Sequence, residues 1–341
     1  MPPYEIDVGE RLMERRSFIQ YLGSLSDAIL DPSVVFSFDQ TGFLRHRLQF
    51  ESEDMNVDMS GRTCVVTGAN SGLGFATAMG LAQRGATVWL VCRSAEKGER
   101  AADQIRHTSG NGRVFCAQVD VSDFQSIDQF HASAEIESID VWINNAGVLL
   151  SERAANVQGF EMTLATNLLG PLRLTSLFLD RLRTGSRSRI IWVSSGGMYA
   201  KRLDVDSLFS PPDPFDGVAA YAQTKRALVV INELIAERLR GRIASHCMHP
   251  GWANTPGVEH SIPNFWKLTR PILRNPESGS DTILWLSVCD KAQTDSGRFW
   301  FDRRARRTHF LRNTEASEQD RHSFWEKVHA WAEVNPSVWG E

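Results

Sequence analysis

The sequence has few cysteines, and none of them forms a recognisable pattern. The five are Cys64, Cys92, Cys116, Cys247 and Cys289, with no C-x-x-C pair and no spacing typical of metal ligands. The first three fall in apolar runs, where cysteine usually serves as a small core residue in a reducing compartment. We therefore expect buried free thiols and no metal.

Long hydrophobic runs are also missing. No apolar run approaches the roughly 18 residues that span a bilayer. The opening stretch MPPYEIDVGERLMERR has neither the cationic start nor the apolar core of a signal peptide. We therefore expect a cytoplasmic protein without a transmembrane segment.

Neither sign of charge dominates the chain. Lys and Arg total 37 against 41 Asp and Glu, a net charge of -4. This balance gives no overall attraction to nucleic acid or anionic lipid, so we expect no nucleic-acid partner. The 341 residues, 42% of them hydrophobic, suffice for one large domain with appendages or two modest domains.

From about residue 60 onward, short apolar runs rich in β-branched residues alternate with longer helical patterns. This alternation predicts an α/β fold with a mostly parallel, doubly wound sheet and helices on both faces. The near-continuous apolar character of the runs suits strands that are buried on both sides. The seven predicted strands are 63–68, 87–93, 113–120, 140–147, 189–195, 242–251 and 297–301.

The two ends of the chain do not follow this pattern, so we assign residues 1–59 and 303–341 as extensions of a domain at 60–302. In 36–50, Phe and Leu alternate with Arg and His, which indicates an amphipathic helix that packs on the protein itself or, alternatively, contacts a membrane surface. Ser317 and Asp320 have capping spacing and predict a docked C-terminal helix. We interpret the basic run before it, 301–312, as a solvated loop.

The first predicted strand runs into TGANSGLG, residues 67–74, and then into a helix. Gly68, Gly72 and Gly74 let the backbone turn tightly and approach a pyrophosphate, which the N-terminus of a helix attracts. The strand before the loop and the helix after it favour a Rossmann-type dinucleotide site over a plain turn.

Tyr221 and Lys225 lie four residues apart in a helical pattern, so both side chains are expected on one face. A phenol has a pKa of about 10. A neighbouring ammonium would lower that pKa and bring the tyrosine toward the range of a general acid or base. The spacing also occurs by chance. A separate feature, Pro171, predicts a bend in the preceding helix near Asn167.

In this order, the motifs resemble those of the short-chain dehydrogenase/reductase family over roughly residues 60–302. The glycine loop has the family form T-G-x-x-x-G-x-G, and the other matches are NNAG at 144–147, Asn167, Ser195 in WVSSGG, the Tyr221–Lys225 pair and HPGWANT at 249–255. SSGGM, PFDG, YAQ-x-K, HPGWA-x-TPGV and SGRF-x-x-DR are similar to its dehydrogenase/reductase member 12-like and retinol-dehydrogenase-like branch.

The resemblance implies an oxidoreductase that interconverts an alcohol and a carbonyl with a nicotinamide cofactor. It implies that Ser195 holds the substrate oxygen, that Tyr221 transfers its proton and that Lys225 bonds the nicotinamide ribose. It implies that Asn167 holds a water molecule that links Lys225 to solvent in a proton relay. It also allows a homodimer through the helices that contain Asn167 and Tyr221. The implied cofactor contacts are Gly68, Asn70, Ser71, Gly72, Leu73, Gly74, Arg93, Asp120, Val121, Asn145, Ala146, Gly147, Tyr221, Lys225, Pro250, Gly251 and Thr255.

The choice of cofactor is read at the end of the second predicted strand. NAD-selective relatives place an acid there, whereas this chain has Arg93, which suits a 2'-phosphate and favours NADP over NAD. Asp120 resembles the acid that contacts adenine in the family, and helix capping is the alternative role for it.

The substrate is less legible. The 25 residues between Ser195 and Tyr221 and the segment 258–276 are expected to flank the cleft. Phe265, Trp266 and Leu268 indicate either an apolar substrate or packing. The alternative function is a catalytically silent dinucleotide sensor or scaffold on the same fold, against which the intact catalytic set argues.

Overall fold

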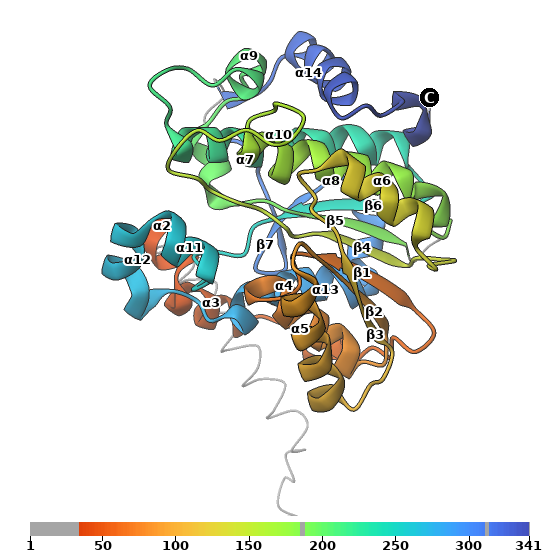
Figure 1. Ribbon diagram of the computed structural model, residues 1–341. Helices are drawn as coiled ribbons and strands as arrows, with labels where there is room; N and C mark the ends of the chain where they lie inside the picture. The colour runs from red at the N-terminus through yellow and green to blue at the C-terminus, as the bar shows by residue number, and fades with distance from the viewer. Residues whose placement is uncertain (1–33, 185–187, 311–313, 341) are drawn as a thin grey trace, which may run out of the picture.

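The computed structural model describes residues 34–184, 188–310 and 314–340, so residues 1–33 of the predicted N-terminal extension lie outside it. Within these ranges one eight-stranded sheet has the order β3-β2-β1-β4-β5-β6-β7-β8 (Figure 1). All neighbours are parallel except β7 and β8. The strands are β1 (Thr63–Thr67), β2 (Thr87–Cys92), β3 (Val114–Gln118), β4 (Val141–Asn144), β5 (Arg189–Val193), β6 (Ala244–Met248), β7 (Phe299–Phe301) and β8 (Arg304–Arg306).

All seven predicted strands are present, but most end before their predicted limits. β4 stops at Asn144 and β6 at Met248, because the residues that follow leave the sheet and form loops at its carboxyl edge. The chain order reverses beside β1, which pairs with both β2 and β4. Ligands of open α/β sheets bind at the carboxyl ends of strands next to such a reversal.

Helices cover both faces of the sheet. The lower face in Figure 1 carries α4 (Gly72–Gln83), α5 (Ala95–Ser109) and α13 (Pro276–Val288), and the upper face carries α6 (Phe124–Ser133), α8 (Gly170–Leu177) and α10 (Gly217–Arg238). Successive strand residues point to opposite faces. Val65 and Trp142 accordingly join one apolar core, while Val66 and Ile143 join the other.

The helix that carries Asn167 is interrupted where Pro171 predicts a bend. Between α7 (Met162–Leu164) and α8, residues Ala165–Leu169 form a π-helical turn. Proline has no N–H and its ring crowds the carbonyl four residues earlier. A side chain on Gly170 would meet the carbonyl oxygen of Val121 at 1.6 Å, so glycine lets α8 approach the loop after β3.

The prediction of a solvated loop over 301–312 is wrong in part, and the sheet has eight strands instead of seven. Arg304–Arg306 form β8, which pairs antiparallel with β7 through a tight turn at Asp302 and Arg303. Both turn residues have positive φ, 48° and 58°. Asp302 is buried because it pairs with a buried arginine, which the run of basic residues did not indicate.

Residues 36–50 form two short helices and not one amphipathic helix. Asp39 ends α2 (Val34–Phe38) and caps α3 (Gln40–Arg47) by accepting the N–H of Gly42 at 2.8 Å. Both helices pack on the domain. The remaining short elements are η1 (Ser52–Met55), η3 (Leu179–Arg181), η4 (Gly196–Ala200), α9 (Val205–Phe209), α11 (Pro256–Ser261), α12 (Pro263–Thr269), η5 (Arg270–Ile272) and η6 (Asp290–Thr294).

The C-terminal helix α14 (Glu318–Trp331) is present as predicted, with the capping box of Ser317 and Asp320 at its start. It lies over α10 beside α9, at the top of Figure 1, and the chain ends with η8 (Pro336–Trp339). Among the described residues, no helix has the length and apolarity needed to cross a membrane.

Candidate active site

Most of the predicted site residues lie at one edge of the sheet, on the loops that follow the carboxyl ends of the first six strands, and Asn167, Tyr221 and Lys225 lie on helices. Gly68 to Gly74 follow β1, Arg93 follows β2 and Asp120 follows β3. Gly147 and Ser195 follow β4 and β5. The HPGWANT segment, which we call the strap (residues 249–255), follows β6. The parallel sheet thus brings together segments that are far apart in sequence.

The glycine loop leaves room for a pyrophosphate. Gly68 and Gly72 have φ of 65° and 56°, which only glycine adopts readily. A side chain on Gly74 would meet the carbonyl oxygen of Gly68 at 2.4 Å. Ser71 begins α4 without a side-chain cap, so the first amides of the helix are left for a ligand. Asn70 and Leu73 are half-buried in the same loop.

A polar brace joins the glycine loop to the loop after β4. The hydroxyl of Thr67 accepts the N–H groups of Asn145 and Ala146, both at 3.0 Å. The side-chain amide of Asn145 donates to the carbonyl of Thr67 at 2.8 Å. These bonds fix the glycine loop and the loop after β4 relative to each other.

The strap closes the other side of the glycine loop. A side chain on Gly72 would meet the methyl group of Thr255 at 3.3 Å, and Thr255 itself caps α11. Gly251 has a φ of 76°, and a side chain there would meet Nε of Arg274 at 2.4 Å. The carbonyl of Pro250 accepts a hydrogen bond from Arg274 at 3.3 Å.

Three predicted contacts lie at the ends of β2 and β3. Arg93 is exposed. The carboxylate of Asp120 accepts the N–H and O–H of Ser122, at 2.9 and 2.7 Å. Asp123 caps α6, so the alternative in which Asp120 is the cap is wrong. Val121 is buried under Gly170.

Ser195, Tyr221 and Lys225 meet beside this groove. The phenol of Tyr221 lies near the hydroxyl of Ser195, which accepts the N–H of Gly197 at 3.3 Å. Nζ of Lys225 lies 5.4 Å from the centroid of the tyrosine ring and donates to the carbonyl of Val193 at 2.9 Å. The lysine is buried, whereas the tyrosine is partly exposed.

The pKa values of this pair differ from the expectation. Burial raises the pKa of the Tyr221 phenol, and the neighbouring Ser195 hydroxyl only partly opposes this effect. The predicted lowering by Lys225 is wrong for this structure, because the ammonium bonds the Val193 carbonyl and not the phenol. Burial also lowers the pKa of Lys225, to about 8.

Asn167 joins the loop after β4 to α10. Its side-chain oxygen accepts the N–H of Val148 at 2.8 Å, and its nitrogen donates to the Val148 carbonyl and the Thr224 hydroxyl, at 2.9 and 3.1 Å. A side chain on Gly147 would meet both Asn167 Oδ1 and Lys225 Nζ, at 3.2 and 3.3 Å. Glycine therefore lets the amide and the ammonium converge here.

The aromatic residues of 258–276 pack on the strap. The rings of Trp252 and Phe265 lie 5.3 Å apart, and the indole N–H of Trp266 donates to Asn254 at 2.8 Å. Leu268 points outward and is 82% exposed. Within the 25 residues between Ser195 and Tyr221, η4 follows Ser195 directly and lies beside the site. Helix α9, in the same stretch, packs against α14.

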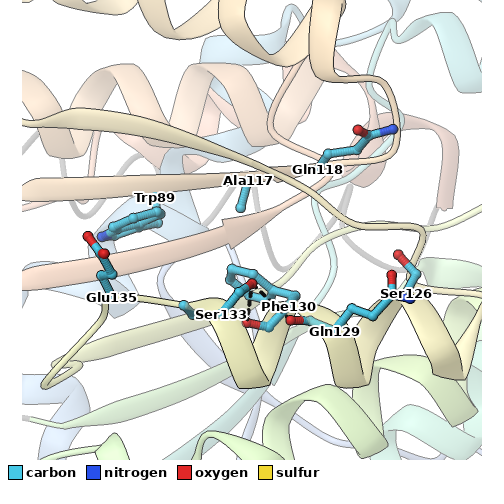
Figure 2. Close-up of a pocket in the computed structure, with 9 residues that line it drawn as sticks. Trp89, Ala117, Gln118, Ser126, Gln129, Phe130, Ser133 and Glu135 are labelled. Atoms are coloured by element: carbon cyan, nitrogen blue, oxygen red, sulfur yellow. Dashed lines mark hydrogen bonds between the residues drawn. The ribbon is translucent and has the colours of Figure 1, made fainter.

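A cavity of about 410 Å³ lies elsewhere, between the sheet edge at β3 and helix α6 (Figure 2). Figure 2 shows Trp89 at one end of it and Gln118 and Ser126 at the other. Neither Ser195, Tyr221 nor Lys225 lines it. It is therefore separate from the catalytic cluster.

Sequence reasoning missed three residues that border the site: Phe38, Arg274 and Asp302. Phe38 and Arg274 belong to no motif noted above. Asp302 is the aspartate of the SGRF-x-x-DR pattern, to which the sequence alone assigned no role. Of the motifs quoted from the sequence, only that pattern could have pointed to one of these three residues.

Comparisons with known proteins agree with this geometry. A family model described as short chain dehydrogenase matches residues 62–264. Dehydrogenase/reductase SDR family member 12 of Bos taurus is 40% identical over 274 residues, covering 80% of this chain and 86% of the relative. Retinol dehydrogenase 11 of Homo sapiens is 36% identical over 251 residues, covering 72% and 79%. An uncharacterised protein from Mycobacterium Paratuberculosis, 26% identical, aligns with a TM-score of 0.67 over 83% of this chain and 97% of its own.

Proposed function

We propose a function from the premise that this chain belongs to the short-chain dehydrogenase/reductase family. The protein is an NADP(H)-dependent enzyme that acts on an apolar alcohol or carbonyl compound. Tyr221 is its general acid and base. Membership makes it a dehydrogenase/reductase acting on CH–OH and C=O groups. The observation that carries the finer proposal is the meeting of Ser195, Tyr221 and Lys225 beside the glycine loop, with Nζ of Lys225 5.4 Å from the centroid of the tyrosine ring.

The residues fit a nicotinamide dinucleotide. The bare backbone of Gly68 and Gly74 and the uncapped start of α4 would hold the pyrophosphate, and Lys225 and Thr255 would lie toward the nicotinamide half. When bound, the nicotinamide supplies or accepts the hydride. The exposed Arg93 supports a 2'-phosphate and so NADP over NAD.

Ser195 and Tyr221 can both bond one substrate oxygen. In carbonyl reduction, the Ser195 hydroxyl orients that oxygen and the Tyr221 phenol gives it a proton. The raised pKa of Tyr221 keeps the phenol protonated at neutral pH, as a proton donor requires. In alcohol oxidation the substrate hydroxyl gives its proton to the oxygen of Tyr221. Lys225, with a pKa of about 8, is mostly charged at pH 7, and its ammonium, held by the carbonyl of Val193, would bond the nicotinamide ribose.

The other finer expectations remain predictions. The aromatic wall of Trp252 and Phe265 supports an apolar substrate. A proton relay through Asn167 and a cytoplasmic location stay predictions. A homodimer through the helices of Asn167 and Tyr221 also remains a prediction. Because α14 packs on α10, the interface of such a dimer would include α14.

The test is NADPH oxidation by the wild type with a panel of aldehydes, ketones, retinoids and steroids, beside Tyr221→Phe. We expect this variant to lose about 10²–10⁴-fold in kcat and still bind NADPH by fluorescence titration. Tyr199→Phe is the matched control, because that hydroxyl bonds the carbonyl of Arg307. Binding of NADPH without turnover of any carbonyl would support the sensor function instead.

A second variant tests the choice of cofactor. Arg93→Ala should raise the KM for NADPH about 10-fold or more and leave the KM for NADH within a factor of two, because only NADPH carries the 2'-phosphate. Equal effects on both cofactors would refute the assignment of Arg93.

A further inference from the structure

Phe38, in the N-terminal segment (residues 34–50), packs against the backbone next to Ser195. A side chain on Gly196 would meet three ring atoms of Phe38, at 2.5, 3.1 and 3.3 Å. The ring is buried, and it also contacts the rings of His249 and Trp252 on the strap, at centroid distances of 4.4 and 6.2 Å. It therefore lies between the turn after β5 and the strap after β6.

The turn after Ser195 needs such support. Two glycines follow Ser195, and glycine has more backbone freedom than any other residue. The Ser195 hydroxyl must face Tyr221 and the substrate oxygen together, and displacement by about 1 Å can cost roughly 100-fold in rate. With no side chain at Gly196, the ring of Phe38 is what fills the space beside this backbone.

Phe38 is itself held firmly. Its carbonyl accepts the N–H of Trp252 at 2.8 Å and Nε of Arg274 at 2.9 Å. Arg274 also donates to the carbonyl of Ser37 at 2.9 Å and forms a two-bond ion pair with Asp302, at 2.6 and 2.8 Å. Asp302 in turn bonds His46 at 2.5 Å. Both ends of the N-terminal segment are thus tied to one buried carboxylate.

We propose that the N-terminal segment is a working part of the active site, in which Phe38 is a positioning residue that sets the Ser195 turn and the strap for the reaction. The inference rests on the proposed function for its rate readout. It makes the segment more than an arm packed on the surface, because the contact reaches the residue next to the one that orients the substrate oxygen.

The first experiment compares Phe38→Ala with Phe36→Ala, two equal truncations on one helix. Phe36 is 51% exposed, and its removal should change neither kcat nor KM. Phe38→Ala should lower kcat for carbonyl reduction about 10–100-fold, with NADPH affinity within a factor of three. Phe38→Leu should restore much of the rate. If Phe38→Ala lowers the melting temperature but keeps the wild-type kcat, Phe38 has only a structural role and the proposal fails.

The second experiment approaches the contact from its other side. Gly196 has an ordinary negative φ, so Gly196→Ala strains no backbone but places a methyl group into the Phe38 ring. We expect Gly196→Ala to lower kcat about 10-fold in the wild type and less than about 3-fold in Phe38→Leu, where the ring is gone. Additive effects of the two substitutions would overturn the proposal.

A readout without turnover separates this inference from the proposed function. Hydrogen–deuterium exchange of the peptide covering 194–201 should be faster in Phe38→Ala than in Phe36→Ala or the wild type. If the wild type turns over no substrate but this peptide loosens, the proposed function fails and the positioning contact stands. If the wild type is active and the peptide is unchanged, only the positioning inference fails.

Discussion

The two segments that flank the domain, residues 34–50 and 314–340, dock on it by opposite means. The N-terminal segment is held by buried charge, since Arg274 and Asp302 are 1% and 2% exposed and His46 completes the cluster. The C-terminal segment (residues 314–340) is held by buried apolar side chains, among them Phe324 and Val328. The first lies beside Ser195, and the second lies on the side of α10 away from it.

This difference indicates a division of labour. A buried ion pair pays heavily for desolvation and adds little net stability, but its geometry is specific. Apolar burial is non-directional and stabilises in proportion to the area removed from water. We therefore expect changes at the buried residues of the N-terminal segment, such as Phe38, to affect both folding and catalysis, and changes in α14 to affect folding alone.

We expect the largest effect from Asp302→Asn, which weakens the attachment of the N-terminal segment because it leaves Arg274 buried without a carboxylate partner. Burial raises the pKa of Asp302, but Arg274 and His46 outweigh it and hold the pKa at about 2, so this charge is present at every ordinary pH. We expect a loss of about 3–5 kcal/mol in unfolding free energy, measured by urea denaturation. Asp295→Asn, whose partner Arg298 is exposed, should lose less than about 0.5 kcal/mol. Equal losses would contradict the importance of burial.

Acidification should release the C-terminal segment before the N-terminal one. Burial, aided by Arg238, lowers the pKa of His329 to about 4, against an ordinary value of 6.5. A neutral histidine therefore stabilises fully above pH 6.5, and this contribution, at most about 3 kcal/mol, is lost as the pH falls toward 4. Asp302 loses its contribution only between about pH 4 and 2.

Hydrogen–deuterium exchange of α14 from pH 7 to pH 4, corrected for the intrinsic rate, measures this effect. His329→Gln can still accept a hydrogen bond from Trp339, as His329 does at 2.8 Å, but cannot titrate. In this variant, the exchange rate of α14 should lose most of its dependence on pH. Because His246 and His249 are also buried, peptides from the sheet serve as the reference for global loosening. An α14 that opens together with the sheet would contradict the order proposed.

The smallest of the three effects is expected from Val328→Ala in the apolar face of α14. Removing two buried methyl groups should cost about 2 kcal/mol and leave kcat and KM unchanged at temperatures where the variant is folded. Val338→Ala, at a position 40% exposed, should cost less than about 0.5 kcal/mol. A fall in kcat for Val328→Ala would show that the back of α10 also controls the chemistry.

Local patterns were enough to predict most of the fold. The strands at 63–68 and 189–195, the glycine loop and the start of α14 each depend on neighbours in sequence, such as a buried run or a capping pair. The match of Ser195, Tyr221 and Lys225 to the family motif predicted their convergence, which the parallel sheet explains.

The rest depends on contacts between distant residues. Arg274 and the Phe38 carbonyl that it binds are 236 residues apart, and no periodicity in either segment indicates the other. The pKa of Tyr221 was predicted in the wrong direction because spacing places Lys225 near the ring but does not show that its ammonium bonds Val193. The hairpin at Asp302 and Arg303 lacks the Asn-Gly or Asp-Gly pair that usually marks such a turn.

The hairpin that adds β8 also affects how the sheet meets other molecules. An unpaired edge strand offers N–H and C=O groups to any passing chain, and proteins guard such edges by keeping them short and charged. Among the described residues, β8 forms one border of the sheet with only Arg304, Ala305 and Arg306, and a strand this short and charged gives little support to the addition of another strand. The opposite border, β3, is longer and carries a partly exposed Phe115 stacked on Trp89. Self-association through added strands would therefore begin at β3.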